Sequence, residues 1–205
     1  MRFAESWNDG TVRKQAADAW KANGSLRLEG LLADDVARTI RDALRGQTHE
    51  MLAASPPAFS YQYGVLPYTP EEHCDHVLCQ FGRWWWSDGT ALAAAITGME
   101  LRPPEDRILV ATLYQRGCFL DPHNDHDGAR RCAFVLGLTE DSWSFAEGGH
   151  LEFLEAAGGT IHVAERRAPG WNTLDLFDVS GTKHLHQVPV LTRDVERRAF
   201  AGWFF

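Results

Sequence analysis

From Arg107 onward the sequence is a series of short apolar runs separated by turn residues, and this pattern constrains the fold more than any other feature. Branched and aliphatic residues dominate 108–114, 132–138 and 183–191, and each run has the length of one strand. The tetrapeptide 156–159, Ala-Ala-Gly-Gly, is typical of a hairpin turn between two more strands. Many short strands of this kind favour a double-stranded β-helix, or jelly roll. We expect a mainly β fold braced by N-terminal helices.

A candidate metal site follows the first of these runs. The segment 121–125 reads Asp-Pro-His-Asn-Asp, and on extended backbone residues i and i+2 project from the same face. His123 and Asp125 are therefore expected to offer a nitrogen and a carboxylate oxygen to one ion. A histidine from a distant strand would complete a two-histidine, one-carboxylate set with open positions. That set is typical of non-haem Fe(II) oxygenases.

A second His-x-Asp triplet, His73-Cys74-Asp75, has the same spacing in a different setting. Thr69, Pro70 and the acidic residues after them predict a helix over Pro70 to Gln80. Residues i and i+2 do not face the same way on a helix, so this triplet is not expected to chelate.

Residues 105 to 205 resemble the prolyl-4-hydroxylase-type 2-oxoglutarate/Fe(II) dioxygenases. The motifs that carry the resemblance are, in chain order, Tyr114-Gln-Arg-Gly-Cys-Phe119-Leu-Asp-Pro-His123-Asn-Asp125, Arg131 to Leu138, Gly148-Gly149-His-Leu151-Glu-Phe153, Asn172-Thr-Leu-Asp-Leu-Phe177, His186-Gln-Val188-Pro-Val190 and Arg197-Arg-Ala-Phe-Ala-Gly202-Trp203-Phe204. The resemblance implies Fe(II) as the metal, 2-oxoglutarate as co-substrate and ascorbate as a candidate accessory reductant. It also implies hydroxylation of an unactivated C–H bond by O2, with succinate and CO2 as co-products.

The resemblance also selects the third ligand. In the family this histidine precedes one valine by two residues and a second by four, which fits His186 with Val188 and Val190. His184 lies two residues earlier and would share a face with His186 on one strand over Lys183 to Leu191. It stays an alternative, as a residue beside the site or a partly exposed strand histidine.

Arg197 is the predicted anchor for the far carboxylate of 2-oxoglutarate, because the family places its basic anchor six residues before the tryptophan of the last strand, here Trp203. A buried carboxylate needs a paired cation, and a guanidinium suits it geometrically. Strand alternation separates Arg197 from Arg198: Ala199 and Ala201 share the face of Arg197 and leave room for a ligand, whereas Phe200 shares the face of Arg198.

Two further positions concern the co-substrate. Tyr114 corresponds to a family tyrosine that reaches the co-substrate or metal region, although a tyrosine of the barrel wall is an equal interpretation. Many relatives carry another tyrosine on the strand after the first ligands, where this chain has Gly137. The second polar contact to the co-substrate must then come from elsewhere.

Composition indicates one domain over residues 1–205, with a helical flank and first strands in 1–104 and the metal- and co-substrate-binding core in 105–205. The chain is 44% hydrophobic and 23% charged, which is ordinary for a globular protein. A net charge of -8 argues against a nucleic-acid partner. No apolar run approaches the roughly 18 residues of a membrane span, and the N-terminus lacks a signal-peptide core. We expect a cytoplasmic protein of unspecified oligomeric state.

The four cysteines are accordingly expected to be reduced. A zinc cluster of His73, Cys74, His76 and Cys79 is disfavoured by its spacing. Cys118 and Cys132 are expected to be small core residues.

The first hundred residues predict helices and short strands. Helices are expected over 11–22 (capped by Asp9 and closed by Gly24), 33–44, 70–80 and 88–96, and strands over 25–28 and 58–63. Trp84, Trp85 and Trp86 are consecutive, so at least one should reach a surface, a pocket rim or an interface. Packing between helices and sheet is the favoured role of this run.

The predicted function is that of a 2-oxoglutarate- and Fe(II)-dependent hydroxylase acting on a small molecule, an amino acid or a peptidyl residue. One alternative is a cupin-type metalloenzyme that uses no 2-oxoglutarate and does not need Arg197. The other is a non-catalytic sensor or binding module on the same fold. Lack of a second domain to grip a protein favours a small molecule or short peptide.

Overall fold

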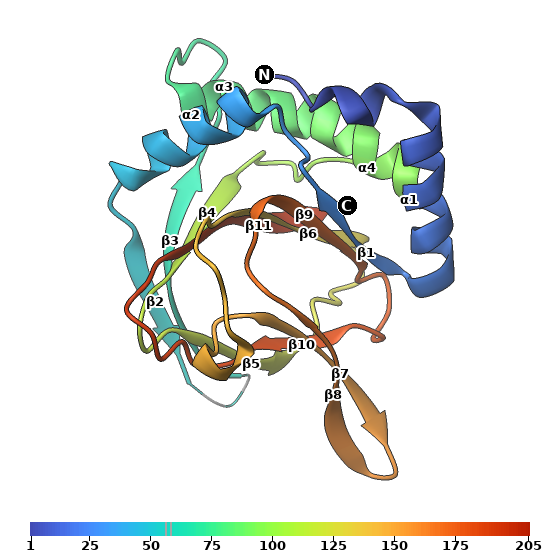
Figure 1. The fold of residues 1–205 in the computed structure, drawn as a ribbon, viewed down its shortest axis with the longest axis vertical. Helices are drawn as coiled ribbons and strands as arrows, with labels where there is room; N and C mark the ends of the chain where they lie inside the picture. Colours follow the sequence, from blue (N-terminus) through green and yellow to red (C-terminus); the bar gives the residue numbers. More distant parts are fainter. Residues whose placement is uncertain (56, 58) are drawn as a thin grey trace.

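A computed structural model gives the structure of the protein and describes every residue except 56 and 58. Its strands form one antiparallel sheet that curls until its two limbs face each other (Figure 1). We call the limbs the major and the minor sheet. The major sheet is, in spatial order, β1 (Ser25–Glu29), β9 (Trp171–Asp178), β6 (Cys132–Leu138), β11 (Arg197–Phe204), β4 (Leu109–Tyr114) and β3 (Tyr61–Tyr68), with β2 (Glu50–Ala54) paired to β3. The minor sheet is β5 (Phe119–His123), β10 (Leu185–Val188), β7 (Leu151–Ala157) and β8 (Thr160–Arg167).

β3 connects the two sheets because it pairs with β4 at one end and with β5 at the other. The hairpin of β7 and β8 turns at the predicted Gly158-Gly159 and projects from the molecule (Figure 1). The predicted mainly β, jelly-roll class is confirmed.

Four helices cover the outer face of the major sheet (Figure 1). The helical segments are α1 (Gly10–Asn23), α2 (Asp34–Arg45), α3 (Val77–Trp84) and α4 (Thr90–Thr97), with the shorter η1 (Glu5–Asn8), η2 (Trp85–Gly89, a π-helix) and η3 (Phe145–Glu147). The largest hydrophobic cluster of the described chain fills the space between these helices and the sheet. Phe200 of β11, for example, packs against Phe81 of α3, with ring centroids 4.9 Å apart.

Local signals account for α1 and α2. The Asp9 carboxylate caps α1 by accepting from the Thr11 amide, and Gly24 ends the helix with a φ of 66°, a left-handed conformation that glycine adopts without strain. α2 buries Val36, Ile40 and Leu44 along one face, as their spacing predicts.

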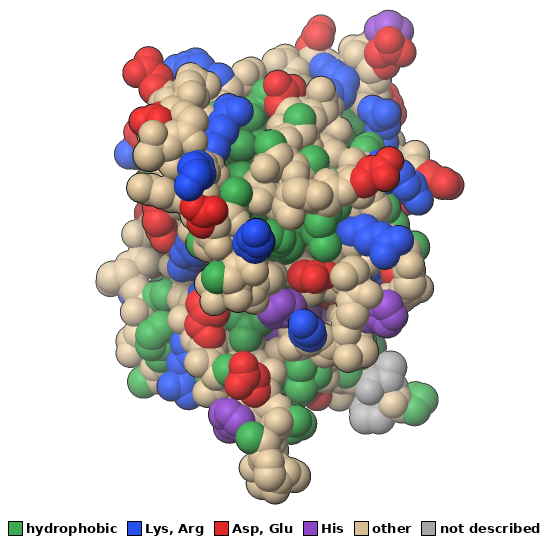
Figure 2. All heavy atoms as spheres, turned by 90° about the vertical axis from the view of Figure 1, so that its right-hand side faces the viewer, with side chains coloured by type: hydrophobic (Ala, Val, Ile, Leu, Met, Phe, Trp, Pro, Cys, Tyr) green, Lys and Arg blue, Asp and Glu red, His purple; other side chains and the backbone are tan. Residues whose placement is uncertain are grey.

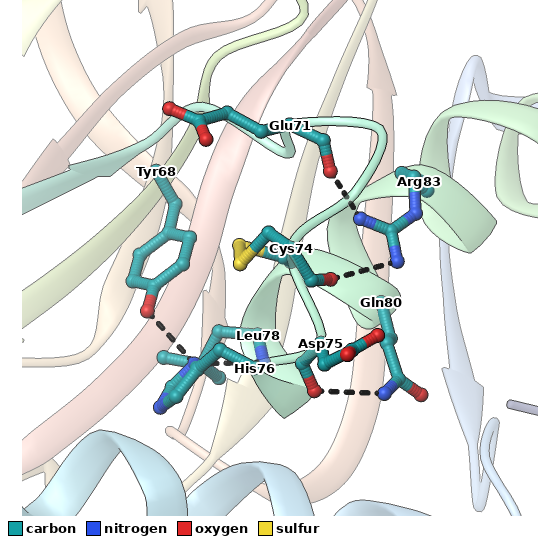
Figure 3. The surroundings of a disulfide bond; sticks show 9 residues. Tyr68, Glu71, Cys74, Asp75, His76, Leu78, Gln80 and Arg83 are labelled. Carbon is teal, nitrogen blue, oxygen red and sulfur yellow. Dashed lines mark hydrogen bonds between the residues drawn. A yellow bond between two sulfur atoms is a disulfide. The ribbon is translucent and has the colours of Figure 1, made fainter.

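The helix predicted over Pro70 to Gln80 is wrong in its first half. Residues 69–76 form turns, and α3 begins at Val77 after His76, whose Nδ1 accepts from the Leu78 amide. The Arg83 guanidinium of α3 braces these turns by donating to the backbone carbonyls of Glu71 and Cys74 (Figure 3). The Glu71 carbonyl also accepts from the Cys74 amide three residues later, which closes a turn in place of the four-residue bond of an α-helix.

A disulfide joins Cys74 to Cys79 across these turns (Figure 3). The expectation that all four cysteines are reduced is therefore wrong for this pair. The turn at Glu71 to Cys74 and the first turn of α3 place the two Cα atoms 5.9 Å apart, within disulfide range. Cys118 and Cys132 are free and buried, as predicted.

Two predicted strands need correction, and one strand was not predicted. The strand expected over 58–63 begins only at Tyr61, Ala58 lying outside the described residues, and it runs on to Tyr68. The strand expected over 183–191 is limited to Leu185–Val188, since Pro189 has no amide to donate. β2 was not predicted, because its residues show little alternation and are mostly exposed.

The tryptophan run serves mainly packing. Trp85 and Trp86 are buried and contact Phe134 at centroid distances of 5.1 and 5.7 Å. Trp84 is partly buried and packs against Phe3 at 4.6 Å.

Basic and acidic side chains alternate on the face shown in Figure 2, which displays no large patch of one sign. Among the helices that the structure describes, none has the length and apolar character needed to cross a membrane.

Candidate metal centre and co-substrate pocket

Strand pairing brings the three predicted ligands together. β5 and β10 are antiparallel neighbours in which His123 lies directly opposite His186, and their ring centroids are 4.2 Å apart. Asp125 follows two residues after His123. Its Oδ1 lies 3.6 Å from Nε2 of His123, and its Oδ2 lies 3.5 Å from Nε2 of His186. One ligand atom from each residue falls within 4.8 Å of the others, the spacing of a metal site.

Both imidazole rings are oriented by backbone carbonyls. His123 Nδ1 lies 2.9 Å from the Asp121 oxygen, and His186 Nδ1 lies 2.9 Å from the His184 oxygen. Because a carbonyl only accepts, each Nδ1 carries the proton and each Nε2 keeps its lone pair. Both lone pairs thus belong to the nitrogens beside Asp125, the arrangement that metal-binding histidines need.

The electrostatics favour an ionised Asp125 carboxylate beside a neutral His186 imidazole. Burial raises the pKa of Asp125, but the contacts with His123, His186 and Trp203 outweigh burial and hold that pKa below its ordinary value. Burial and the neighbouring His123 lower the pKa of His186 to about 4. Two nitrogen donors and one carboxylate oxygen fit Fe(II), and the single negative charge offsets part of the charge of the ion.

His184 is excluded from this cluster. It lies outside β10, so it does not share a strand face with His186 as predicted, and its ring packs near Phe153 and Phe177. It contributes through its backbone, whose carbonyl orients His186.

Arg197 is a buried guanidinium, 7% exposed, on the strand next to Tyr114. It lies 4.9 Å from the centre of the Tyr114 ring and donates from Nη1 to the Gly149 carbonyl at 2.9 Å. Across residues 1–55, 57 and 59–205, no carboxylate oxygen lies within 4.0 Å of this guanidinium. Burial lowers the pKa of Arg197, yet a guanidinium stays charged at neutral pH. The site therefore fits an anionic ligand such as the far carboxylate of 2-oxoglutarate.

Arg198 points away from this site, as alternation predicts. Its guanidinium pairs with Glu196 at 2.7 Å and donates to the Leu44 carbonyl at the helix-covered side of the sheet.

The metal cluster and Arg197 line one cavity of about 640 Å³ between the two sheets. Apolar side chains such as Leu120, Val135 and Val188 form part of its wall. Tyr63 and Tyr114 also line it, stacked in parallel with centroids 5.1 Å apart. Burial raises the pKa of both tyrosines, so both hydroxyls stay protonated and able to donate.

Gly137 accounts for the missing family tyrosine. A Cβ at this position would lie 2.7 Å from the Gly170 carbonyl oxygen and 2.8 Å from Thr173 Oγ1, so the strand admits no side chain there. Tyr63 and Tyr114 are the candidates for the second polar contact to the co-substrate.

The cavity also holds residues that were not assigned to the site from the sequence, among them Phe59, Tyr63, Arg130 and Trp203. Phe59 stacks on His123 at 4.7 Å, Tyr63 stacks on Tyr114, and the Arg130 guanidinium lies 3.7 Å from the centre of the Trp203 ring. Alternation over 59–63 was a signal for the first two. Only the fold of the 126–131 turn against β11 places Arg130 in the cavity.

The comparisons with known proteins agree with this geometry. The model of the 2OG-Fe(II) oxygenase superfamily matches residues 109–205. A mouse protein named prolyl 3-hydroxylase OGFOD1 is 26% identical over 222 aligned positions, which cover 99% of this chain and 39% of the mouse protein. The chain thus spans well under half of that relative.

Two solved structures share the fold. A prolyl-4-hydroxylase of Pseudomonas putida superposes with a TM-score of 0.66 at 21% identity, covering 94% of this chain and 97% of its own. A Trichoplax adhaerens prolyl hydroxylase, solved with a peptide of hypoxia inducible factor, gives a TM-score of 0.71 at 16% identity. The superposition covers 98% of this chain and 94% of that protein. The part of the chain that matches the 2OG-Fe(II) oxygenase superfamily, residues 109–205, is also the part that carries His123, Asp125, His186 and Arg197.

Proposed function

We propose that this chain is a 2-oxoglutarate- and Fe(II)-dependent oxygenase that hydroxylates a prolyl residue of a peptide or protein. The superfamily match supports the reaction class, and relatives named prolyl hydroxylases support the substrate class. The chain spans only part of those relatives, so the substrate is argued from the cavity.

The observation that carries the proposal is one cavity holding both a two-histidine, one-carboxylate cluster and a buried arginine without a carboxylate partner. A cupin-type enzyme without 2-oxoglutarate would leave Arg197 uncompensated, and burial of an unpaired charge is costly. The same cation suits a co-substrate that brings its own carboxylate.

Each residue of the candidate site has a distinct binding role in this proposal. Nε2 of His123, Nε2 of His186 and the Asp125 carboxylate would hold Fe(II), and Arg197 would hold the far carboxylate of 2-oxoglutarate. Bound together, the two groups would activate O2: 2-oxoglutarate would give up two electrons as it becomes succinate and CO2, with one oxygen atom entering succinate and the other converting a C–H bond to an alcohol. The apolar walls exclude water, and the Asp121 and His184 carbonyls keep the imidazole protons on Nδ1.

The open part of the cavity suits a pyrrolidine ring. Phe59 stacks on the His123 ring, and Arg130, which lies over the Trp203 ring, is 4.0 Å from the Asp125 carboxylate. Aromatic faces pack well against an aliphatic ring, while the Arg130 guanidinium offers donors to a peptide carbonyl beside it. Glu50 and Leu52 of β2 extend the lining away from the metal, which gives room for residues that flank a proline.

Two measurements test the proposal. Anaerobic Fe(II) and 2-oxoglutarate, added together, are expected to give a weak visible charge-transfer band, which a cupin-type enzyme or a binding module without a 2-oxoglutarate site would not give. Incubation with O2, ascorbate and a panel of proline-containing peptides should then form succinate and add one oxygen to a peptide, detected by mass spectrometry. A band without any peptide oxidation, together with oxidation of free amino acids or small molecules, would contradict the peptidyl substrate.

A further inference from the structure

A buried carboxylate lies on the outer face of the minor sheet, on the opposite side of the strands from the metal cluster. Glu152 of β7 is 4% exposed. Its oxygens accept from Gln187 Nε2 at 2.6 Å, from Arg166 Nε at 2.8 Å and from His150 Nε2 at 2.9 Å. A carboxylate in such a place is costly unless it is fully hydrogen-bonded, and these three donors satisfy it.

Strand register explains why these groups meet. Gln187 of β10 and Arg166 of β8 are each the direct partner of Glu152 in the ladder. Directly opposed residues lie on the same face of a sheet, so the three side chains form a row across three strands. The bond between Glu152 and Gln187 therefore joins β7 to β10 through side chains, in addition to the backbone ladder.

His186 immediately precedes Gln187 and faces inward, because successive residues of a strand alternate between faces. β10 has only four residues, and its ladder with β5 is irregular between His186 and Val188. Its ladder with β7 is regular over Leu185, His186 and Gln187. His186 is thus placed by β5 and β7 together, and on the β7 side it lies next to Gln187, which Glu152 holds.

We propose that Glu152 is a positioning residue for the metal centre, which holds β10 through Gln187 and so places His186 beside His123 and Asp125. The inference rests on the proposed function, in that His186 is taken as a metal ligand. Arg166 and His150 support Glu152 without contacting β10, and the Arg166 side chain is 51% exposed. Loss of the Gln187 bond should therefore disturb the metal, whereas loss of the Arg166 bond should not.

The experiment is a titration with Co(II), a stand-in for Fe(II) that O2 does not readily oxidise, followed by its visible d–d spectrum. Glu152→Ala and Gln187→Ala are each expected to weaken Co(II) binding about tenfold, the lower end for groups that orient metal ligands, and to change the d–d band. Glu155→Ala on the same strand and Arg166→Ala are the controls, and both should keep wild-type affinity and spectrum. In the double variant Glu152→Ala/Gln187→Ala, the loss should not exceed that of the stronger single variant, since both remove the same bond.

Wild-type affinity and spectrum in Gln187→Ala would overturn the positioning role, because this variant leaves Glu152 paired to Arg166 and His150. Circular dichroism would show whether Glu152→Ala folds. If it does not fold, Gln187→Ala alone tests the positioning role. Equal losses in Arg166→Ala and Gln187→Ala would overturn it too, as a sign of general loosening of the sheet. Wild-type protein that fails to bind Co(II) would overturn both this inference and the proposed function, whereas wild-type binding with an unaffected Gln187→Ala overturns this inference alone.

Discussion

The major and minor sheets face each other across one cavity, yet they are held together by different means. The major sheet is covered on its outer face by α1 to α4 and shares with them the largest apolar cluster. The minor sheet, by contrast, carries a hydrogen-bonded polar row on its outer face, in which the buried Glu152 accepts from Gln187 and Arg166. Its inner face supplies His123 and His186, whereas the major sheet supplies Arg197.

This contrast separates two requirements. Apolar packing is non-directional and tolerates small shifts, so it suits a platform. Metal ligands need placement within a fraction of an ångström, and directional hydrogen bonds such as Nδ1 to a backbone carbonyl provide it. We expect substitutions in the major-sheet core to act mainly on stability, and substitutions in the minor sheet to act mainly on metal binding.

The largest expected effect is on the metal ligands of the minor sheet. His186→Ala should abolish Fe(II)-dependent succinate formation, because two of three ligands do not hold the ion in an active geometry, while the melting temperature changes little. Succinate assays and thermal melts measure the two quantities. His184→Ala is the matched control and should remain active, since only its backbone carbonyl touches His186. An inactive His184→Ala with an active His186→Ala would contradict the site.

Substitutions in the core of the major sheet should lower stability and leave metal binding unchanged. Phe200→Ala is expected to lower the free energy of unfolding by about 3–5 kcal/mol, because a fully buried ring leaves a cavity against Phe81. Co(II) affinity of the protein that remains folded should be unchanged. Ile161→Ala, at a position 60% exposed on the projecting hairpin, should stay within about 0.5 kcal/mol of wild type in the same urea titrations. A fall in metal affinity that parallels the loss of stability would remove the distinction between the sheets.

Arg197 differs from the other buried residues of the major sheet, because it is expected to bind 2-oxoglutarate. Arg197→Ala should weaken 2-oxoglutarate binding by about 3–5 kcal/mol, the cost of leaving a buried charge unpaired, with metal affinity retained. Calorimetric titration in the presence of Co(II) measures both. Arg198→Ala removes the neighbouring guanidinium and its Glu196 pair and should leave 2-oxoglutarate affinity unchanged. The opposite ranking of the two variants would assign the anchor to Arg198.

The smallest expected effect is the pH dependence contributed by Glu152. Burial raises its pKa, but the bonds from Arg166, Gln187 and His150 outweigh burial and hold that pKa below the ordinary 4.5. A carboxyl whose pKa is lower in the folded state stabilises the fold above the ordinary value and loses this contribution as pH falls through the folded value. The stability difference between wild type and Glu152→Gln should therefore be larger at neutral pH than at about pH 4. Urea unfolding at both pH values measures it, and a difference that grows on acidification would contradict the assignment.

Local patterns in the sequence were enough to predict much of the fold and of the candidate site. The spacing of His123 and Asp125, the alternation that separates Arg197 from Arg198 and the caps of α1 depend on neighbours within a few residues. Such patterns can be recognised from the sequence alone, because backbone geometry sets the periods of strands and helices. The choice of His186 over His184 came from a family motif, and it agrees with the pairing of His186 to His123.

Tertiary structure alone decided the remainder. Arg83 donates to the carbonyls of Glu71 and Cys74 in turns that stand where Thr69 and Pro70 predict a helix, and Cys74 reaches Cys79 across these turns. Nothing near Glu152 in the sequence distinguishes it from other strand residues. It is buried and hydrogen-bonded to two neighbouring strands only because β7 lies between β8 and β10. These features depend on which distant segments meet. Hydrophobic periodicity fixes the face that a strand buries, but the partners of its polar side chains follow from the register between strands, which no local pattern contains.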